Sequence, residues 1–359
     1  MGRAVRTWAL AAVLGFGGLA APGRGQDPDG PSRRAAEGAA AIYAGAMERA
    51  VSILRSGRRA EYDLARTELT RALQAMDGSP EPWYWLGLLE MADGKAPRLV
   101  RARARDAAAR AGDGFPEAHL LEGQLRLREG DSDYQAAHVS LALALRGLEA
   151  RREAEGGAAA AGPDPLAALA RYNLGRLHYH RTAGARANPE ARRADLAEAA
   201  RLLSGAEPDL ARLAAERPAW VPVRAECLMY LGWCAFDGRE YAKADPFFAQ
   251  AMELDPASAE PPFWRGLCAR RNGRLAEADR WFARAIASVD EWNRLRPGDR
   301  RPPHAEAMLQ RASLCWSGDP ELHNPWLGVE RLREFVREAP THPLRAAVAR
   351  YLAKAEAGD

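Results

Sequence analysis

The chain has 359 residues, with 51 basic and 48 acidic side chains and a formal net charge of +3. Such a small charge gives no electrostatic reason to expect binding to nucleic acid or to an anionic membrane. Alanine, arginine and glutamate are abundant, which favours helices, and no alternating run of Val, Ile or Thr predicts a sheet.

The first 25 residues have the anatomy of a secretory signal. A short basic region precedes an apolar run, Trp8–Ala21, and Gly23 and Gly25 are small enough for cleavage before the next residue. The run is shorter than the roughly 20 residues of a membrane-spanning helix, so an uncleaved anchor is the less favoured alternative. We therefore expect export to the periplasm or secretion, with no membrane insertion after cleavage. Removing 1–25 leaves 48 basic and 48 acidic side chains.

The mature chain then falls into segments of different composition. Residues 26–36 are rich in polar residues, Gly and Pro, and we expect a disordered leader. Degenerate helical repeats are expected over 37–150, followed by a flexible Ala-, Gly- and Pro-rich linker at 151–167. C-terminal helical repeats are expected over 168–359. Their last helix, 343–356, is rich in Arg, Lys and Ala and is expected to cover the open end of the repeat array.

The clearest signal is a pattern that occurs twice, in residues 225–258 and 259–292. Small and aromatic residues recur 34 positions apart: Gly232 and Gly266, Cys234 and Cys268, Ala244 and Ala278, Phe248 and Phe282, Ala251 and Ala285. Their spacing within each unit places the small residues on one helix face, where a second helix can approach closely. A fixed period of this length is typical of a repeat architecture.

These residues resemble the tetratricopeptide repeat, a helix–turn–helix unit with the pattern W-x2-L-G-x2-Y, then A-x3-F-x2-A, then P. The resemblance runs from Leu231 and Gly232 through Phe248 to Pro256. It implies an all-α fold, a right-handed solenoid of helical hairpins that forms a tetratricopeptide-like superhelix. We expect roughly six or seven units, each in contact only with its neighbours.

The resemblance also implies that the first helices line a concave groove for a peptide or protein partner. Aligned on the first-helix glycine, the groove residues would be Tyr84, Leu88, Met91, Leu120, Gln124, Leu127, Arg128, Tyr172, Arg176, Tyr179, His180, Met229, Trp233, Phe236, Phe263, Leu267, Arg270 and Arg271. Aromatic residues, Met and Arg suit a binding surface. The alternative is that tight curvature or the insertions bury several of them inside the protein.

Family members that clamp a C-terminal carboxylate use Lys and Asn at two of these positions. Here Met229 and Trp233, or Phe263 and Leu267, occupy them, so that subtype is not predicted.

No motif predicts a metal, a cofactor or a reaction. Cys227 and Cys234 lie about 10 Å apart along one predicted helix, too far for a disulfide, and we interpret the cysteines as small buried hydrophobic residues. His178 and His180 would point to opposite sides of a helix, which disfavours a shared metal. The chain has no G-x-S-x-G, no phosphate loop and no H-E-x-x-H.

The sequence therefore predicts an exported, non-enzymatic scaffold that binds a partner protein or peptide, in envelope assembly or secretion. One alternative is an architectural homo-oligomer whose apolar groove is filled by a second copy. The least favoured is an enzyme or accessory subunit with a site built by the insertions at 151–168, 182–194 and 291–303.

Overall fold

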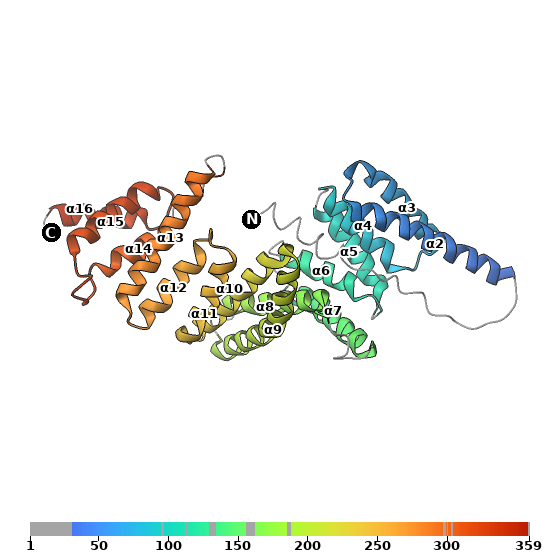
Figure 1. The fold of residues 1–359 in the computed structure, drawn as a ribbon, viewed down its shortest axis with the longest axis horizontal. Coiled ribbons are helices and arrows are strands. Elements are labelled where there is room, and N and C mark those ends of the chain that lie inside the picture. Colours follow the sequence, from blue (N-terminus) through green and yellow to red (C-terminus); the bar gives the residue numbers. More distant parts are fainter. Residues whose placement is uncertain are drawn as a thin grey trace. The chain divides into compact units, whose positions relative to one another are not determined.

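Helices form all the regular secondary structure of the described residues. The computed structural model describes residues 31–94, 97–112, 114–128, 134–155, 162–184, 188–296, 299, 301–302 and 304–357. Fifteen α-helices lie within these ranges, and they contain no strand (Figure 1). The all-α prediction is confirmed. The expected signal, 1–25, lies outside the described residues.

The chain divides into two compact units, one ending at Trp220 and the other beginning at Val221. In the first unit the helices pack in consecutive pairs, and the second helix of a pair packs against the first helix of the next. The pairs are α2 (Pro31–Ser56) with α3 (Tyr62–Ala75), α4 (Pro80–Ala92) with α5 (Pro97–Ala111), α6 (Pro116–Arg128) with α7 (Tyr134–Ala154), and α8 (Pro165–Gly184) with α9 (Pro189–Glu216). A short 3-10 turn, Pro218–Trp220, ends this unit.

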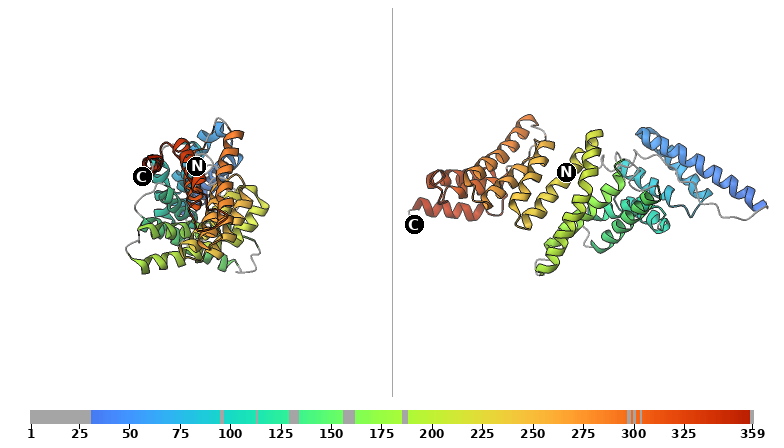
Figure 2. Two further views of the ribbon diagram at one scale, coloured as in Figure 1. Left: turned by 90° about the vertical axis from the view of Figure 1, so that its left-hand side faces the viewer. Right: turned by 60° about the horizontal axis from the view of Figure 1, so that its bottom comes forward.

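The second unit repeats the arrangement with the most regular part of the sequence. Its helices are α10 (Val221–Asp237) with α11 (Tyr241–Leu254), α12 (Glu260–Arg271) with α13 (Leu275–Leu295), α14 (Ala305–Leu314) with α15 (Pro325–Glu338), and a last helix, α16 (Arg345–Ala357). Figure 2 shows α12 to α15 as a row of adjacent helices, and consecutive helices in it contact each other. None of the helices in the described ranges has the length and apolar character needed to span a membrane.

Two segment boundaries differ from the sequence-based expectation. The helix α2 begins at Pro31, so residues 31–36 are helical where a disordered leader was expected. Residues 151–154 belong to α7, because their Arg, Glu and Ala are good helix formers. Helices α7 and α8 then pack against each other across the expected linker, and the division into units comes after Trp220 instead.

The approach of the two helices in a pair is set by a glycine facing a large side chain. A Cβ atom added at Gly232 would lie 2.5 Å from a ring carbon of Phe248, and one at Gly266 would lie 2.6 Å from the ring of Phe282. Both phenylalanines are fully buried. Leucine takes this role in the first unit, where Gly123 faces Leu141 and Gly175 faces Leu203. The repeated spacing thus predicts the helix contacts of the second unit, whereas Leu141 and Leu203 follow their glycines at other distances along the chain.

Candidate functional site

A patch of aromatic rings joins the first helices of two pairs in the second unit. Trp233 and Phe236 lie on α10, and Trp264 lies on α12. The Trp264 ring centroid is 5.9 Å from that of Trp233 and 5.1 Å from that of Phe236. All three side chains are half-buried. The rings therefore form one continuous surface across two helices.

Three more residues lie on the same face of α12, toward the C-terminal end of the helix. Leu267 follows Trp264 by three residues, and Arg270 and Arg271 follow Leu267 by three and four, spacings that place them on one face. Leu267 and Arg270 are half-buried, and Arg271 is exposed. We call Trp233, Phe236, Trp264, Leu267, Arg270 and Arg271 the aromatic–arginine face.

The arginines of this face have no carboxylate beside them among the described residues. The Nη1 group of Arg270 donates to Gln310 Oε1 and, at 3.1 Å, to Ser313 Oγ. Burial and the neighbouring Arg271 lower the pKa of Arg270. The Arg271 guanidinium makes neither a hydrogen bond nor an ion pair within the described ranges. An anionic group placed here would be attracted by two positive charges without displacing an internal acid.

Ion pairs between consecutive repeats fix the helices that carry the face. On α11, Asp245 accepts from Arg265 of α12 at 2.8 and 3.3 Å. Asp279, 34 residues later on α13, accepts from Arg311 of α14 at 3.0 and 3.4 Å. The aspartate is thus part of the repeated pattern, and it joins each pair to the next.

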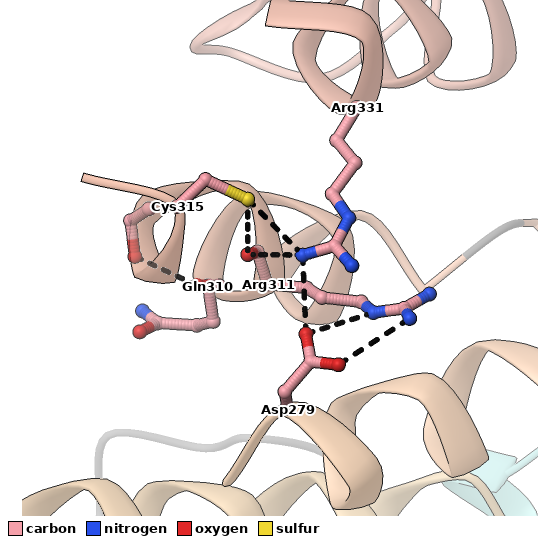
Figure 3. Close-up of polar contacts among 6 residues, drawn as sticks. Asp279, Gln310, Arg311, Cys315 and Arg331 are labelled. Carbon is pink, nitrogen blue, oxygen red and sulfur yellow. Dashed lines mark hydrogen bonds and ion pairs between the residues drawn. The ribbon is translucent and has the colours of Figure 1, made fainter. Parts of the chain in front are cut away.

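A second arginine reinforces the later contact, as Figure 3 shows. Arg331 of α15 donates to Asp279 at 3.1 Å, to the carbonyl oxygen of Arg311 at 3.1 Å and to the sulfur of Cys315 at 3.3 Å. Asp279 therefore ties three helices together. This contact also fixes α14, whose Gln310 receives the hydrogen bond from Arg270.

Comparisons with known proteins show which solved structures have a similar fold. Neither a protein-family model nor a curated protein matches the chain. Among solved structures, the assembly chaperone of RpL4, Acl4, is 16% identical; the match covers 78% of this chain and 97% of that one, with a TM-score of 0.50. PilF of Pseudomonas aeruginosa is 14% identical over 73% of this chain and 95% of its own, with a TM-score of 0.47.

A third match is the C-terminal part of a TPR repeat-containing protein from Cytophaga hutchinsonii, 12% identical over 87% of this chain and 98% of that one, with a TM-score of 0.47. The paired helices, the 34-residue spacing and the glycine contacts agree with the match to Acl4, whose TM-score is 0.50. The chain has the tetratricopeptide-repeat fold.

The structure buries several residues that the tetratricopeptide resemblance placed in a groove. Tyr84, Leu88, Tyr172, Met229 and Phe263 are at most 9% exposed, and Leu88 is fully buried. They pack inside the helix array and do not form an open surface. Leu120 is buried as well.

In the first unit the physical reason is the close approach of successive first helices. Helices α4 and α6 contact each other directly. The ring of Tyr84 lies edge-on to those of Trp85 and Phe115, with centroids 5.6 and 5.3 Å away. Positions that would face a wide groove therefore face a neighbouring helix, as the alternative interpretation held.

The remaining expected residues lie in two places. Trp233, Phe236, Leu267, Arg270 and Arg271 come together on the aromatic–arginine face. In the first unit, Arg176 lies over the Tyr172 ring at 5.3 Å, and Tyr179 lies edge-on to the exposed His180 at 6.0 Å. Met91, Gln124 and Leu127 are half-buried. The side chain of Arg128 lies outside the described residues.

Sequence reasoning missed Trp264, which is the central ring of the face. It stacks on the core Phe248 with a centroid distance of 5.9 Å and an interplanar angle of 21°. Its indole N–H donates to Glu260 Oε2 at 3.3 Å. The repeat pattern assigned the adjacent Phe263 to the groove and left Trp264 without a role. Helical spacing relates residues of one helix only, and Trp264 lies on a different helix from Trp233 and Phe248. The contact between these rings is therefore visible only in the folded structure.

Metal-binding and thiol chemistry have little support in the described ranges. The cysteines Cys227, Cys234, Cys268 and Cys315 are buried free thiols, and burial raises the pKa of Cys234 and of Cys268 to about 12. No set of three His, Cys, Asp or Glu side chains in the described residues is placed to hold a metal.

Proposed function

We propose that this chain is a non-enzymatic scaffold that binds a polypeptide partner through the aromatic–arginine face. The observation that carries the proposal is the continuous surface of three half-buried aromatic rings next to two arginines without carboxylate partners. Trp, aromatic and Arg side chains dominate the binding free energy of protein interfaces. The tetratricopeptide fold holds them on packed helices, so little ordering is needed on binding.

The chemistry of the face indicates the kind of segment that fits it. The rings of Trp233, Phe236 and Trp264 offer apolar area for aliphatic or aromatic side chains of the partner. Arg270 and Arg271, at the C-terminal end of α12, favour a carboxylate in the same segment. A partner segment that combines apolar side chains with an acidic residue is therefore the best match.

The experiment compares capture of partners by the wild-type chain and by the double variant Trp233→Ala/Phe236→Ala. Tagged mature proteins are incubated with extract of the native envelope, and the bound proteins are identified and titrated. Loss of a hot-spot ring weakens binding by about 2 kcal/mol or more. We expect the double variant to lose the partner that wild type retains, while its melting temperature falls much less than that of Phe248→Ala.

Two control variants distinguish a loss of binding from a loss of folding. Phe248 is fully buried, so its truncation should cost about 3–5 kcal/mol of unfolding free energy. Trp326 is 84% exposed at the start of α15, a helix that contributes no residue to the face, and Trp326→Ala should leave capture unchanged. If the double variant melts as early as Phe248→Ala, the rings are core and the proposal fails. Light scattering of the wild type detects the alternative, self-association.

We also propose that residues 1–25 export the chain to the periplasm or the exterior. A basic start, an apolar run and small residues at the end support this reading. Residues 1–30 fused to a reporter should carry it out of the cytoplasm and be trimmed near Gly25. A full-length reporter that stays in the cytoplasm would refute export.

A further inference from the structure

The second helix pair carries an arginine close to its glycine contact. Phe248 and Phe282 lie 16 residues after Gly232 and Gly266, and their rings cover those glycines. The residue 16 positions after Gly87 is Arg103 on α5. A Cβ atom added at Gly87 would lie 3.5 Å from the Cβ of Arg103. The next residue, Ala104, is fully buried and takes the core position that Phe248 and Phe282 hold, so the half-buried Arg103 lies at the edge of the helix contact.

Arg103 and a second arginine both lie over one indole ring. The guanidinium carbon of Arg103 lies 5.0 Å from the centroid of Trp83 on α4, and that of Arg110 lies 4.8 Å from it. Neither guanidinium forms an ion pair with a carboxylate of the described residues. Arg110 donates only to the backbone oxygen of Asp106, at 3.1 Å. Two positive charges without a carboxylate partner among the described residues thus lie close to the ring.

Two hydrogen-bond donors at this place are buried and have no acceptor among the described residues. They are the indole N–H of Trp83 and the Nε–H of Arg103. A buried donor without an acceptor is costly, and natural structures rarely leave one. Stacking of a cation on an indole face offsets part of the charge burial, but it supplies no acceptor for either N–H group.

We propose that Trp83, Arg103 and Arg110 form a binding site for a carboxylate. A carboxylate is planar and has two acceptor oxygens, so one oxygen can take the indole N–H while the other takes a guanidinium N–H. Its negative charge neutralises one of the two guanidinium groups. Arg110 is exposed, so its side chain can move off the ring to admit the ligand.

This site is separate from the aromatic–arginine face. It lies between α4 and α5 of the first unit, whereas the face lies on α10 and α12 of the second. The carboxylate can belong to a free small molecule or to an acidic side chain of a partner. Failure of one proposal leaves the other standing.

The test is an NMR titration that follows the indole N–H resonance of Trp83 in the mature protein labelled with 15N. The variant Trp83→Phe identifies the peak. Sodium acetate is exchanged for sodium chloride at constant ionic strength. We expect a saturable downfield shift with a dissociation constant on the order of 10 mM. Inorganic phosphate and an acidic peptide, with its amidated counterpart, are titrated in parallel to distinguish the sources.

Arg103→Phe is the matched variant, because it removes the guanidinium charge and the unpaired Nε–H while keeping a large side chain beside the ring. It should fold and melt no earlier than wild type, and acetate should no longer shift the Trp83 peak. Arg110→Gln should raise the acetate dissociation constant at least about tenfold, because one charge-assisted contact is lost. A Trp83 peak that acetate leaves unmoved, or moves equally in Arg103→Phe, overturns the proposal. A response to phosphate alone overturns the carboxylate assignment.

Discussion

Equivalent turns of the two regular repeats hold a glycine in one repeat and an arginine in the other, both in the left-handed backbone conformation. The turn between α12 and α13 has Gly273 at φ 77°, and the turn between α10 and α11 has Arg239, 34 residues earlier, at φ 64°. Both residues donate their N–H to the oxygen three residues before, at 3.1 Å in the first case and 2.9 Å in the second. Arg239 is thus held in the left-handed region by a turn that suits glycine.

The expected effect of Arg239→Gly follows from this geometry. A left-handed conformation costs an L-residue about 1–2 kcal/mol, which glycine avoids. The greater conformational freedom of glycine in the unfolded chain lowers the stability by about 0.5–1 kcal/mol and offsets part of this gain. The Arg239 side chain is exposed and makes no hydrogen bond or ion pair with the described residues, so no contact is lost. Arg239→Gly should therefore stabilise the second unit by about 0.5–1 kcal/mol.

Urea unfolding followed by tryptophan fluorescence measures this difference, and Gly273→Ala is the reciprocal control. A Cβ atom at Gly273 meets no atom within 4 Å, so the cost of that variant isolates the backbone conformation. It should destabilise by about 1 kcal/mol. An Arg239→Gly protein that unfolds at the same or a lower urea concentration than wild type, with Gly273→Ala destabilised as expected, would refute the reasoning.

Two further predictions test the packing and the ion pairs by urea unfolding. Gly232→Ala should cost about 1–3 kcal/mol, because the new methyl group would lie 2.5 Å from a ring carbon of Phe248. Gly38→Ala, on an open helix face, should instead stabilise by about 0.5–1 kcal/mol; equal effects would exclude the contact as the cause. Asp279→Asn should cost about 2–3 kcal/mol because it leaves two arginines without their carboxylate. The exposed pair at Glu198 is the control, and Glu198→Gln should cost about 0.5 kcal/mol or less.

The sequence predicts best where packing is periodic. The 34-residue spacing identifies the Gly232 and Phe248 contact and its repeat at Gly266 and Phe282, because helix pairs of fixed length must present the same residues to each other. The spacing also gives the fold class. These features depend on contacts within one pair and its neighbour, which the local pattern determines.

The sequence predicts poorly where the distance between non-consecutive helices matters. Leu88 and Tyr84 occupy positions that face either a groove or a neighbouring first helix, depending on how closely α4 approaches α6. No pattern within one repeat reports that distance. Trp264 was missed for the same reason, since its importance comes from rings on α10 that precede it by a whole repeat.

The two proposed sites differ in how their residues are buried. The rings of the aromatic–arginine face pack on the core with one side, as Trp264 does on Phe248, and leave the other side open to a partner. Arg103 is half-buried beside the core residue Ala104, and its Nε–H is buried without an acceptor among the described residues. A surface with no partner costs little, whereas two buried donors with no acceptor lower the stability of the unligated pair. Without ligand, the free energy of unfolding should therefore rise in Arg103→Phe and remain unchanged in Arg271→Ala. This contrast distinguishes a site with buried donors from one on the surface.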